Sequence, residues 1–315
     1  TRADLDARAA AADEDATVLA LGLGGASDAV ATDHPSLAAY AAAEPLGADP
    51  DPVLALAGLV AGGGDPETDA PELVEAAGLE RRPGLAAPTE DLADGLAHTT
   101  LVHAPYSGDS DSTVELVAGI DDDADRRVAS LLVIDAVTAD GATERAAAAI
   151  ERAIHPLAGG PFETVEGYAD VLGALAATAP GQAVALAIGG GGGPTADAAL
   201  DAWREHAVAA HEAVRTAETE RHDGLLVTRT DGPVEAVARL LRDFRSPEPA
   251  VLAIGTRDDE DQSHAALATV DAPAEPIEPA AEAAGGSGLA RGTTGFARFD
   301  ADREGDLVEA IQGAR

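Results

Sequence analysis

The sequence lacks several residue types, and each absence excludes a class of protein. There is no cysteine and no methionine, so disulfide bridges and thiolate metal sites are excluded. Lysine and asparagine are absent too, so that all 20 basic residues are arginine. A P-loop ends in Lys followed by Ser or Thr, so the five glycines at 189–193 are interpreted as a flexible turn rather than a nucleotide site.

Long apolar runs are also missing. No stretch of about 18 apolar residues occurs, which argues against a membrane-spanning helix, and no signal peptide opens the chain. These features predict a soluble cytoplasmic protein without membrane contact. The chain begins at Thr1 rather than at Met, which leaves room for residues upstream.

Positive charge is scarce, because 57 acidic residues face 20 arginines and the formal net charge is −37. Self-repulsion at this charge opposes folding in dilute buffer, whereas molar salt shortens the Debye length to about 3 Å and removes most of the cost. The carboxylates are spread along the whole chain, which predicts adaptation to a salt-rich cytoplasm, as in a salt-in halophile. The alternative is an acidic surface that recruits a basic partner.

What is present is enough apolar sequence for a core, at 46% of 315 residues, and a length typical of about two domains. The first two thirds of the chain are mainly helical in pattern. The apolar spacing predicts strands at 17–21, 30–33 and 183–188, and helices at 53–61, 89–97 (capped by Thr89), 112–120 (capped by Ser112), 126–137, 142–154, 165–178 and from Thr195 to about 220.

Beyond residue 221 strands and helices alternate, which predicts an α/β fold with a domain boundary at this point. The pattern gives strands at 224–230, 250–254, 265–270 and 296–299, helices at 233–244 and 303–312, and loops at 273–279 and 285–295.

Two short motifs carry residues that bind hard divalent ions. Asp33 and His34 directly follow a predicted strand, where side chains project into the crevice of an open α/β sheet, and Asp65 follows Gly64 after a helix. Carboxylate and imidazole together suit Mn²⁺ or Mg²⁺. The alternative is that Asp33, His34 and Asp65 are ordinary turn residues.

A glycine-rich segment near the C-terminus is the best candidate for binding an anion. It contains Gly285, Gly286 and Gly288, followed by Arg291 and, in the next predicted strand, Arg298. Exposed amides and guanidinium groups hold a phosphodiester backbone through charge-assisted hydrogen bonds. The alternative is a loop that is only flexible.

The histidines form no obvious site. His206 and His211 lie five residues apart on the predicted long helix, about 500° of rotation at 100° per residue, so we expect them to point in different directions. His98 and His103 have the same spacing. No His-x-x-x-His pair and no nucleophile motif occurs.

The order of these motifs resembles the DHH phosphoesterases with a C-terminal DHHA1 domain, in particular the RecJ-like, single-strand-specific exonuclease branch. The resemblance implies a DHH-like domain at 1–194 with a helical region at 89–180, a connecting helix at 195–220 and a DHHA1-like domain at 221–315. The residues that carry it are Gly22-Leu-Gly24, Asp33-His34, Gly64-Asp65, Arg82-Pro83, Pro105-Tyr-Ser-Gly108 and Gly285-Gly-Ser-Gly288.

The sequence departs from that family at its metal ligands. The Asp-x-Asp motif of that family is absent, and Gly22-Leu-Gly24 stands where its second metal-binding Asp is expected. Pro35 stands in place of the second histidine of the Asp-His-His motif. Leu289 stands in place of the histidine expected after the glycines of the DHHA1 domain. A two-metal phosphoesterase needs several carboxylates. The remaining residues would hold at most one Mn²⁺ or Mg²⁺, so we expect weak or absent hydrolysis.

Three functional hypotheses follow. The first is a degenerate RecJ-like protein that binds single-stranded DNA or RNA in a replication or RNA-processing complex with a protein partner, using Arg291 and Arg298. The second is an active manganese-dependent exonuclease or oligonucleotide phosphodiesterase completed by residues upstream of Thr1. The third is a protein-binding scaffold without nucleic-acid affinity, which the charge of −37 favours.

Overall fold

A computed structural model describes residues 34–118, 144–255 and 261–314 of the protein. The chain forms two compact units, Thr1–Gly78 and Leu79–Arg315. The strands expected at 17–21 and 30–33, the helix expected at 126–137, and Asp33 lie outside the described residues. The domain division expected at 194 and 220 stays a prediction.

The described part of the first unit is helical, and its helices begin in similar ways. It contains α2 (Pro35–Ala43), the 3-10 helix η1 (Glu44–Leu46), α3 (Pro52–Ala61), α4 (Pro66–Asp69) and α5 (Pro71–Ala76). Proline occupies the first turn of α3, and Asp51 Oδ1 accepts the backbone N–H of Val53 at 2.8 Å. The helix predicted at 53–61 is confirmed.

The second unit begins with a helical region. Its elements are β1 (Glu80–Arg81), α6 (Leu92–His98), α7 (Ser110–Val117), α9 (Glu144–Ala153), β2 (Leu157–Ala158), α10 (Val165–Thr178), α11 (Pro180–Ile188) and α12 (Pro194–Thr216). Strands β1 and β2 pair in antiparallel. The predicted helices at 89–97, 112–120, 142–154 and 165–178 are therefore confirmed, with shifts of a few residues at their ends.

Several details of these helices differ from expectation. Aspartates cap α6 and α7, since Asp91 and Asp109 accept the N–H groups of the first turn, so Thr89 and Ser112 are not the caps. Gly193 precedes α12, which has no side-chain cap and ends at Thr216. Proline in the first turn lets α12 begin without one.

The strand predicted at 183–188 is wrong, because these residues form most of α11. The hexapeptide is uniformly apolar, so its pattern alone does not separate a buried strand from a helix. Pro180 at the start of α11 and the high helix propensity of alanine and leucine favour the helix.

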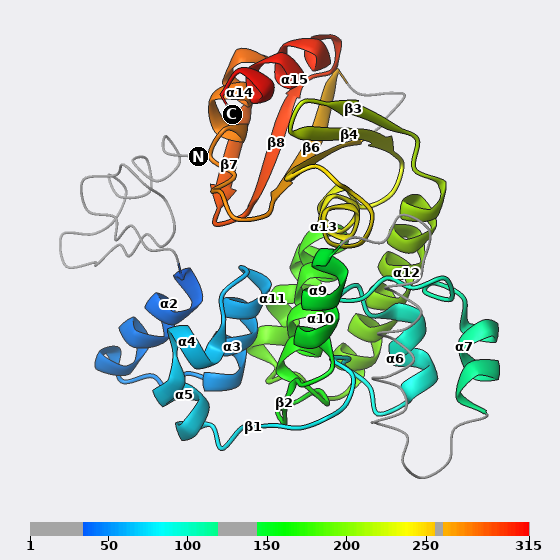
Figure 1. Ribbon diagram of the computed structural model, residues 1–315. Helices are drawn as coiled ribbons and strands as arrows, with labels where there is room; N and C mark the ends of the chain where they lie inside the picture. The colour runs from blue at the N-terminus through cyan, green and yellow to red at the C-terminus, as the bar shows by residue number, and fades with distance from the viewer. Residues whose placement is uncertain (1–33, 119–143, 256–260, 315) are drawn as a thin grey trace. The chain divides into compact units, whose positions relative to one another are not determined.

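The C-terminal part of the second unit is a six-stranded sheet covered by helices on both faces (Figure 1). Its strand order is β3-β4-β5-β6-β8-β7, in which β4 and β5 are parallel and the other neighbours antiparallel. The elements are β3 (Thr219–His222), β4 (Leu225–Thr230), α13 (Val234–Phe244), β5 (Ala250–Gly255), β6 (Gln262–Thr269), α14 (Ile277–Ala283), β7 (Ser287–Arg291), β8 (Thr294–Asp300), η2 (Ala301–Arg303) and α15 (Glu304–Gly313). This arrangement confirms the α/β fold class.

Alternation along the strands gives each face of the sheet its own core. Val251, Ala253 and Ala266 pack with α13 and with the helical region, whereas Leu252, Ala265 and Leu267 pack with α14 and α15. The helix α13 covers only part of its face, which leaves the strands β8 and β7 beyond it more exposed.

Of the two loops predicted in this region, one is only partly right and the other is wrong. In the segment 273–279 the first four residues form neither helix nor strand, as predicted, but α14 begins at Ile277. Residues 285–295 contain β7, the turn Gly292-Thr293 and the start of β8, which together form a two-residue β-hairpin. Gly292 has φ +51°, a conformation that this kind of tight turn favours and that glycine adopts without strain.

Candidate nucleic-acid interface

The register of the last three strands brings the two predicted arginines to the same side of the sheet. Arg298 of β8 lies between His264 of β6 and Ser287 of β7. Two residues before Arg298 in β8, Phe296 lies opposite Leu289 of β7, and two residues before that, Thr294 lies opposite Arg291. Because side chains alternate between faces, all of these point to the face on which α13 also lies.

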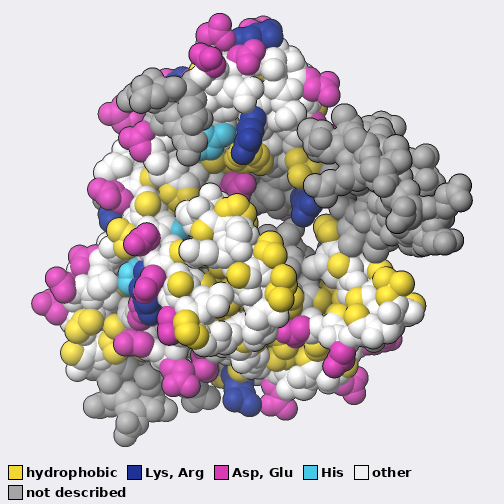
Figure 2. Space-filling view, turned by 180° about the vertical axis from the view of Figure 1, so that it is seen from behind, with side chains coloured by type: hydrophobic (Ala, Val, Ile, Leu, Met, Phe, Trp, Pro, Cys, Tyr) yellow, Lys and Arg dark blue, Asp and Glu magenta, His cyan; other side chains and the backbone are white. Residues whose placement is uncertain are grey.

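We call this surface the arginine face. It consists of His264, Ser287, Leu289, Arg291, Thr294, Phe296 and Arg298. The carboxylate residue Asp300, in the same phase of β8, borders it. Arg291, Arg298 and Ser287 are exposed, and Leu289 retains 43% of its accessible surface. Figure 2 shows basic and histidine side chains beside hydrophobic ones on this part of the molecule.

The arginines of this face differ from most of the other described arginines. Several guanidinium groups donate to a carboxylate, as in the pairs Arg81–Glu166, Arg204–Asp94, Arg221–Glu248, Arg229–Glu304, Arg242–Asp243 and Arg303–Asp306. Three others, Arg145, Arg215 and Arg239, donate to backbone carbonyl oxygens. Arg152 and Arg245 resemble the arginines of this face, since neither has a carboxylate pair among the described residues. Within the part of the chain that the structure describes, Arg291 and Arg298 have no such carboxylate and no side-chain hydrogen bond. Their positive charge is therefore available to an anion.

The glycines proposed for phosphate binding have packing roles. A Cβ on Gly286 would lie 1.8 Å from the carbonyl oxygen of Arg298, and one on Gly288 would lie 2.8 Å from the carbonyl oxygen of Ile277. Gly285 has φ +80° and lies against the Asp300 carboxylate. These three positions require glycine to bring β7 close to β8 and α14, and a direct role of their amides in anion binding stays a prediction.

Sequence reasoning missed His264 and Phe296 as members of this surface. Their strands were predicted, at 265–270 and 296–299, but the pairing of β6 with β8 decides which residues meet. The ring centroids of His264 and Phe296 are 6.2 Å apart, with planes inclined by 38°. The sequence did offer one indication of Phe296: it lies two residues before Arg298, so the two side chains lie on the same face of the predicted strand.

The predicted metal ligands lie in the first unit, and the structure brings two of them to a common neighbour. His34 Nε2 lies 3.9 Å from Asp69 Oδ1, and Asp69 Oδ2 accepts the backbone N–H of Asp65 at 2.8 Å. Asp65 Oδ1 in turn accepts the N–H groups of Glu67 and Thr68, each at 3.0 Å. Asp69 is not among the predicted ligands, although its reciprocal bond with Asp65 resembles a capping box.

These bonds use the carboxylates for capping α4. Among the described residues, no three His, Asp or Glu side chains are placed so that they could hold one ion. His34 and Asp65 therefore do not by themselves fit a manganese or magnesium centre. Since Asp33 lies outside the described part of the chain, the metal stays a prediction, and no chemical step is derived through it.

A second polar cluster lies buried among α6, α10, α12 and α13. The Asp170 carboxylate accepts the backbone N–H of Thr100 at 2.9 Å, the Thr100 hydroxyl, and the indole N–H of Trp203 at 2.8 Å. Arg239 donates to the carbonyl and hydroxyl oxygens of Thr100 at 2.8 and 2.7 Å. Nearby, hydrogen bonds from His98 and Arg204 overcome the effect of burial and lower the pKa of Asp94.

Two histidines that were expected to form no site meet in this region from different elements. His103 Nδ1 lies 3.0 Å from His211 Nδ1, and the two rings stack with centroids 5.3 Å apart. His211 Nε2 lies 3.2 Å from the carbonyl oxygen of Thr99, which can only accept. His211 Nε2 therefore carries a proton, its Nδ1 accepts, and His103 Nδ1 donates to it.

Burial determines the charge of this histidine pair. Desolvation, with nearby arginines, lowers the pKa of His103 to about 3. Desolvation likewise lowers the pKa of His211 to about 3, and His103 and Arg215 add to the effect. Both imidazoles are neutral at pH 7, so the cluster contributes to the fold rather than to binding an anion.

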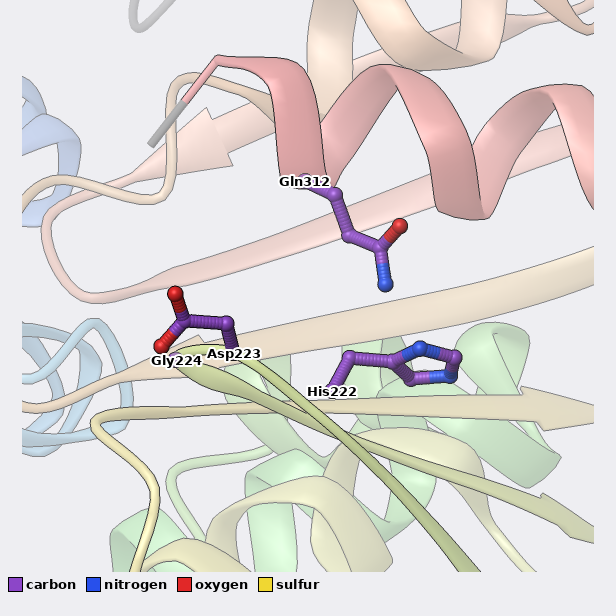
Figure 3. Close-up of a pocket in the computed structure, with 4 residues that line it drawn as sticks. All are labelled: His222, Asp223, Gly224 and Gln312. Atoms are coloured by element: carbon purple, nitrogen blue, oxygen red, sulfur yellow. The ribbon is translucent and has the colours of Figure 1, made fainter.

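A small open pocket of about 500 Å³ lies beside the turn between β3 and β4. It is lined by His222, Asp223, Gly224 and, from α15, Gln312 (Figure 3). The His222 imidazole and the Gln312 amide point toward the same space, while the Asp223 carboxylate points away from them. The lining has no arginine, which makes it a poorer anion site than the arginine face.

Comparisons with known proteins place the chain in a family. A family model described as the C-terminal domain of uncharacterized protein rrnAC1427 matches residues 217–313, from β3 to α15. The chain is 46% identical over 296 residues to uncharacterized protein rrnAC1427 of Haloarcula marismortui, in an alignment that covers 91% of this chain and 78% of that protein. The chain belongs to the rrnAC1427 family.

Solved structures extend the comparison of this rrnAC1427-family chain to its fold. It is similar to CDC45 from Entamoeba histolytica with a TM-score of 0.50 at 8% identity, over 92% of this chain and 73% of that chain. This likeness supports the α/β architecture. A pGpG-specific phosphodiesterase, PggH from Vibrio cholerae, aligns over 42% of this chain and half of its own, with 11% identity and a TM-score of 0.28, which is too low to inform the fold.

Among the described residues, no helix combines the length and apolar character needed to cross a bilayer.

Proposed function

We propose that this protein binds single-stranded nucleic acid through the arginine face. The observation that carries the proposal is the position of Arg291 and Arg298 on one exposed side of β7 and β8, without a carboxylate partner in the described residues. In a chain with a net charge of −37, a surface with two unneutralised guanidinium groups favours an anionic ligand.

The spacing of the two arginines suits an extended phosphodiester backbone. They lie on neighbouring strands and four residues apart along the strand direction, which places their Cα atoms about 14 Å apart. This distance exceeds the size of a single phosphate, so each arginine would contact a different phosphate of the same strand. An extended polyanion therefore fits better than a mononucleotide.

We propose that cleavage is weak or absent. Asp65 and Asp69 accept backbone N–H groups of the turn around α4, which uses carboxylate oxygens that a two-metal phosphoesterase would need for its ions. The alternative, an active manganese-dependent exonuclease, requires further ligands from Asp33 and from residues upstream. Release of labelled nucleotides from a single-stranded oligonucleotide with added Mn²⁺, abolished by Asp33→Ala, would support that alternative instead.

We also propose that binding takes place within a larger assembly. The resemblance to RecJ-like proteins implies a replication or RNA-processing complex, and much of the acidic surface is available to a protein partner. A scaffold that binds only protein is the competing function. It predicts a stable co-purifying partner and no retention on single-stranded DNA.

The deciding experiment measures binding of a fluorescently labelled single-stranded oligonucleotide by anisotropy in molar KCl. We expect Arg291→Gln combined with Arg298→Gln to weaken binding about tenfold or more, because each charge-assisted hydrogen bond contributes roughly 1.5–3 kcal/mol. The control is Arg221→Gln, on β3 at the opposite edge of the sheet from β7, whose side chain pairs with Glu248. Equal affinity of the double variant and the native protein would overturn the proposal.

A further inference from the structure

The arginine face has an apolar centre between its two arginines. In successive cross-strand rows, Arg298 lies beside Ser287, Phe296 beside Leu289, and Thr294 beside Arg291. The row of Phe296 and Leu289 is thus flanked by one arginine on each side, each about 7 Å away along its strand. A purely phosphate-binding surface would not need an apolar row at this position.

The exposure of this row is unusual for the protein. Only 3% of the residues are aromatic, and the chain has four phenylalanines. Phe296 is nevertheless only partly buried, and its neighbour Leu289 keeps 43% of its surface. By contrast, Phe299 on the opposite side of β8 is fully buried with α15. Core packing buries all of Phe299, whereas Phe296 packs against the core on the α13 side with only part of its ring and keeps the rest exposed.

The His264 ring lies next to Phe296 and adds a second aromatic side chain to this row. The space that the ring occupies exists because residue 255 is glycine. The imidazole lies over Gly255 of β5, where a Cβ would come within 2.2 Å of His264 Cε1. Any residue other than glycine at 255 would displace the imidazole. Because the ring centroid lies 6.2 Å from that of Phe296, the two rings form adjacent parts of one surface beside Arg298.

From these contacts we propose that His264 and Phe296 form a stacking platform for a nucleobase, with Arg298 and Arg291 holding the phosphates on either side. The proposal rests on the proposed function and adds the mode of recognition. Aromatic faces stack on any unpaired base, whereas the bases of a duplex are already stacked on one another. The platform thus makes the face selective for unpaired bases without reading their sequence.

The charge of the protein supports stacking as the major source of affinity. Phosphate contacts lose strength as salt rises, and a chain of this acidity needs salt to screen its own repulsion. Stacking on aromatic and apolar side chains does not depend on counterion release. It therefore persists under the conditions in which the two arginines alone would bind weakly.

The test compares two labelled probes of equal length in molar KCl, oligo-dT and an abasic deoxyribose-phosphate strand that lacks bases. We expect the native protein to bind oligo-dT about tenfold more tightly than the abasic strand, in line with base-stacking energies. His264→Ala and Phe296→Leu should remove most of this preference. His222→Ala, a histidine beside the separate pocket near β3 and β4, should leave it unchanged.

The outcomes distinguish this inference from the proposed function. Equal binding of both probes by the native protein would overturn the platform and leave phosphate binding intact. A preference that survives in both His264→Ala and Phe296→Leu, with folding verified by circular dichroism, would also overturn it. Absence of binding to either probe would instead overturn the proposed function.

Discussion

Arginine has opposite roles in two regions of the second unit. In the helical region, Arg239 is hydrogen-bonded to Thr100, which in turn donates to the buried Asp170. On the arginine face, Arg298 is exposed and the described residues offer it no carboxylate. A polar group whose bonds are all made within the protein stabilises the fold, whereas one left without a partner on the surface is available to a ligand.

The histidines of the two regions differ in burial. His103 and His211 are buried, bonded to one another and held neutral. His264 instead lies at the edge of a partly exposed aromatic surface. Substitutions in the buried region should therefore change stability, and substitutions on the arginine face should change binding. The predictions below test this separation.

The largest effect is expected at the centre of the buried region. Asp170→Ala removes the acceptor of the Thr100 N–H, the Thr100 hydroxyl and the Trp203 N–H. It also removes one of the two carboxylates, with Asp243, that compensate the charge of Arg239. We expect a loss of about 3–5 kcal/mol in the free energy of unfolding, measured by urea titration in molar KCl. Asp201→Asn, at an exposed carboxylate, is the control and should change stability little. A loss as small as that of the control would contradict the role given to Asp170.

A pH dependence should follow from the histidine pair. Both pKa values are about 3 in the folded protein and about 6.5 in the unfolded chain, so the unfolded state binds more protons between these values. Stability is therefore fully present above pH 6.5 and falls as the pH decreases toward 3, by about 1.4 kcal/mol per pH unit for each histidine. Urea titrations between pH 7 and pH 5 measure this slope.

His211→Gln and His103→Gln identify the residues responsible for the slope. Each variant should reduce its steepness, since one group that titrates only in the unfolded state has been removed. Gln312→Ala, which removes no titratable group, should keep the native slope. If all three variants show the same slope, the acid sensitivity has another origin.

A glycine connects stability with binding. In Gly286→Ala the new Cβ would overlap the carbonyl of Arg298, so β7 must move away from β8. We expect a loss of about 1–3 kcal/mol in stability together with weaker oligonucleotide binding, because Arg291 and Leu289 move with β7. Gly305→Ala, at a helical glycine with open space around it, should leave both unchanged. Normal binding by a destabilised Gly286→Ala protein would show that the position of β7 does not matter for the ligand.

Much of the fold could be predicted from the sequence because local patterns determine it. The helix predicted at 165–178 from its apolar periodicity has the same bounds in the structure. The strand at 183–188 was wrong because a uniformly apolar hexapeptide has no period. The loop at 285–295 was wrong because its glycines serve close strand packing rather than flexibility.

The candidate site was predicted only in part. Arg291 and Arg298 stand out in an acidic chain, so composition was sufficient to select them. His264 and Phe296 belong to strands paired across more than 30 residues, and that pairing is a tertiary property. The contact of His103 with His211 spans 108 residues and was missed for the same reason. Patterns in a single sequence do not show which distant elements come into contact, so this part of the site could not be predicted.

The smallest expected change in stability is at Arg298 itself, and it separates the two roles of arginine most directly. Arg298→Gln removes a side chain with no carboxylate partner in the described residues, so we expect a change within about 0.5 kcal/mol in the free energy of unfolding. Arg204→Gln breaks the paired hydrogen bonds to Asp94, at 2.9 and 3.0 Å, and should destabilise measurably without affecting oligonucleotide affinity. Parallel urea and anisotropy titrations compare the two variants. If Arg298→Gln instead destabilised the protein as much as Arg204→Gln, the Arg298 side chain would have a partner within the fold. That result would contradict the proposal that the arginine face binds an external ligand.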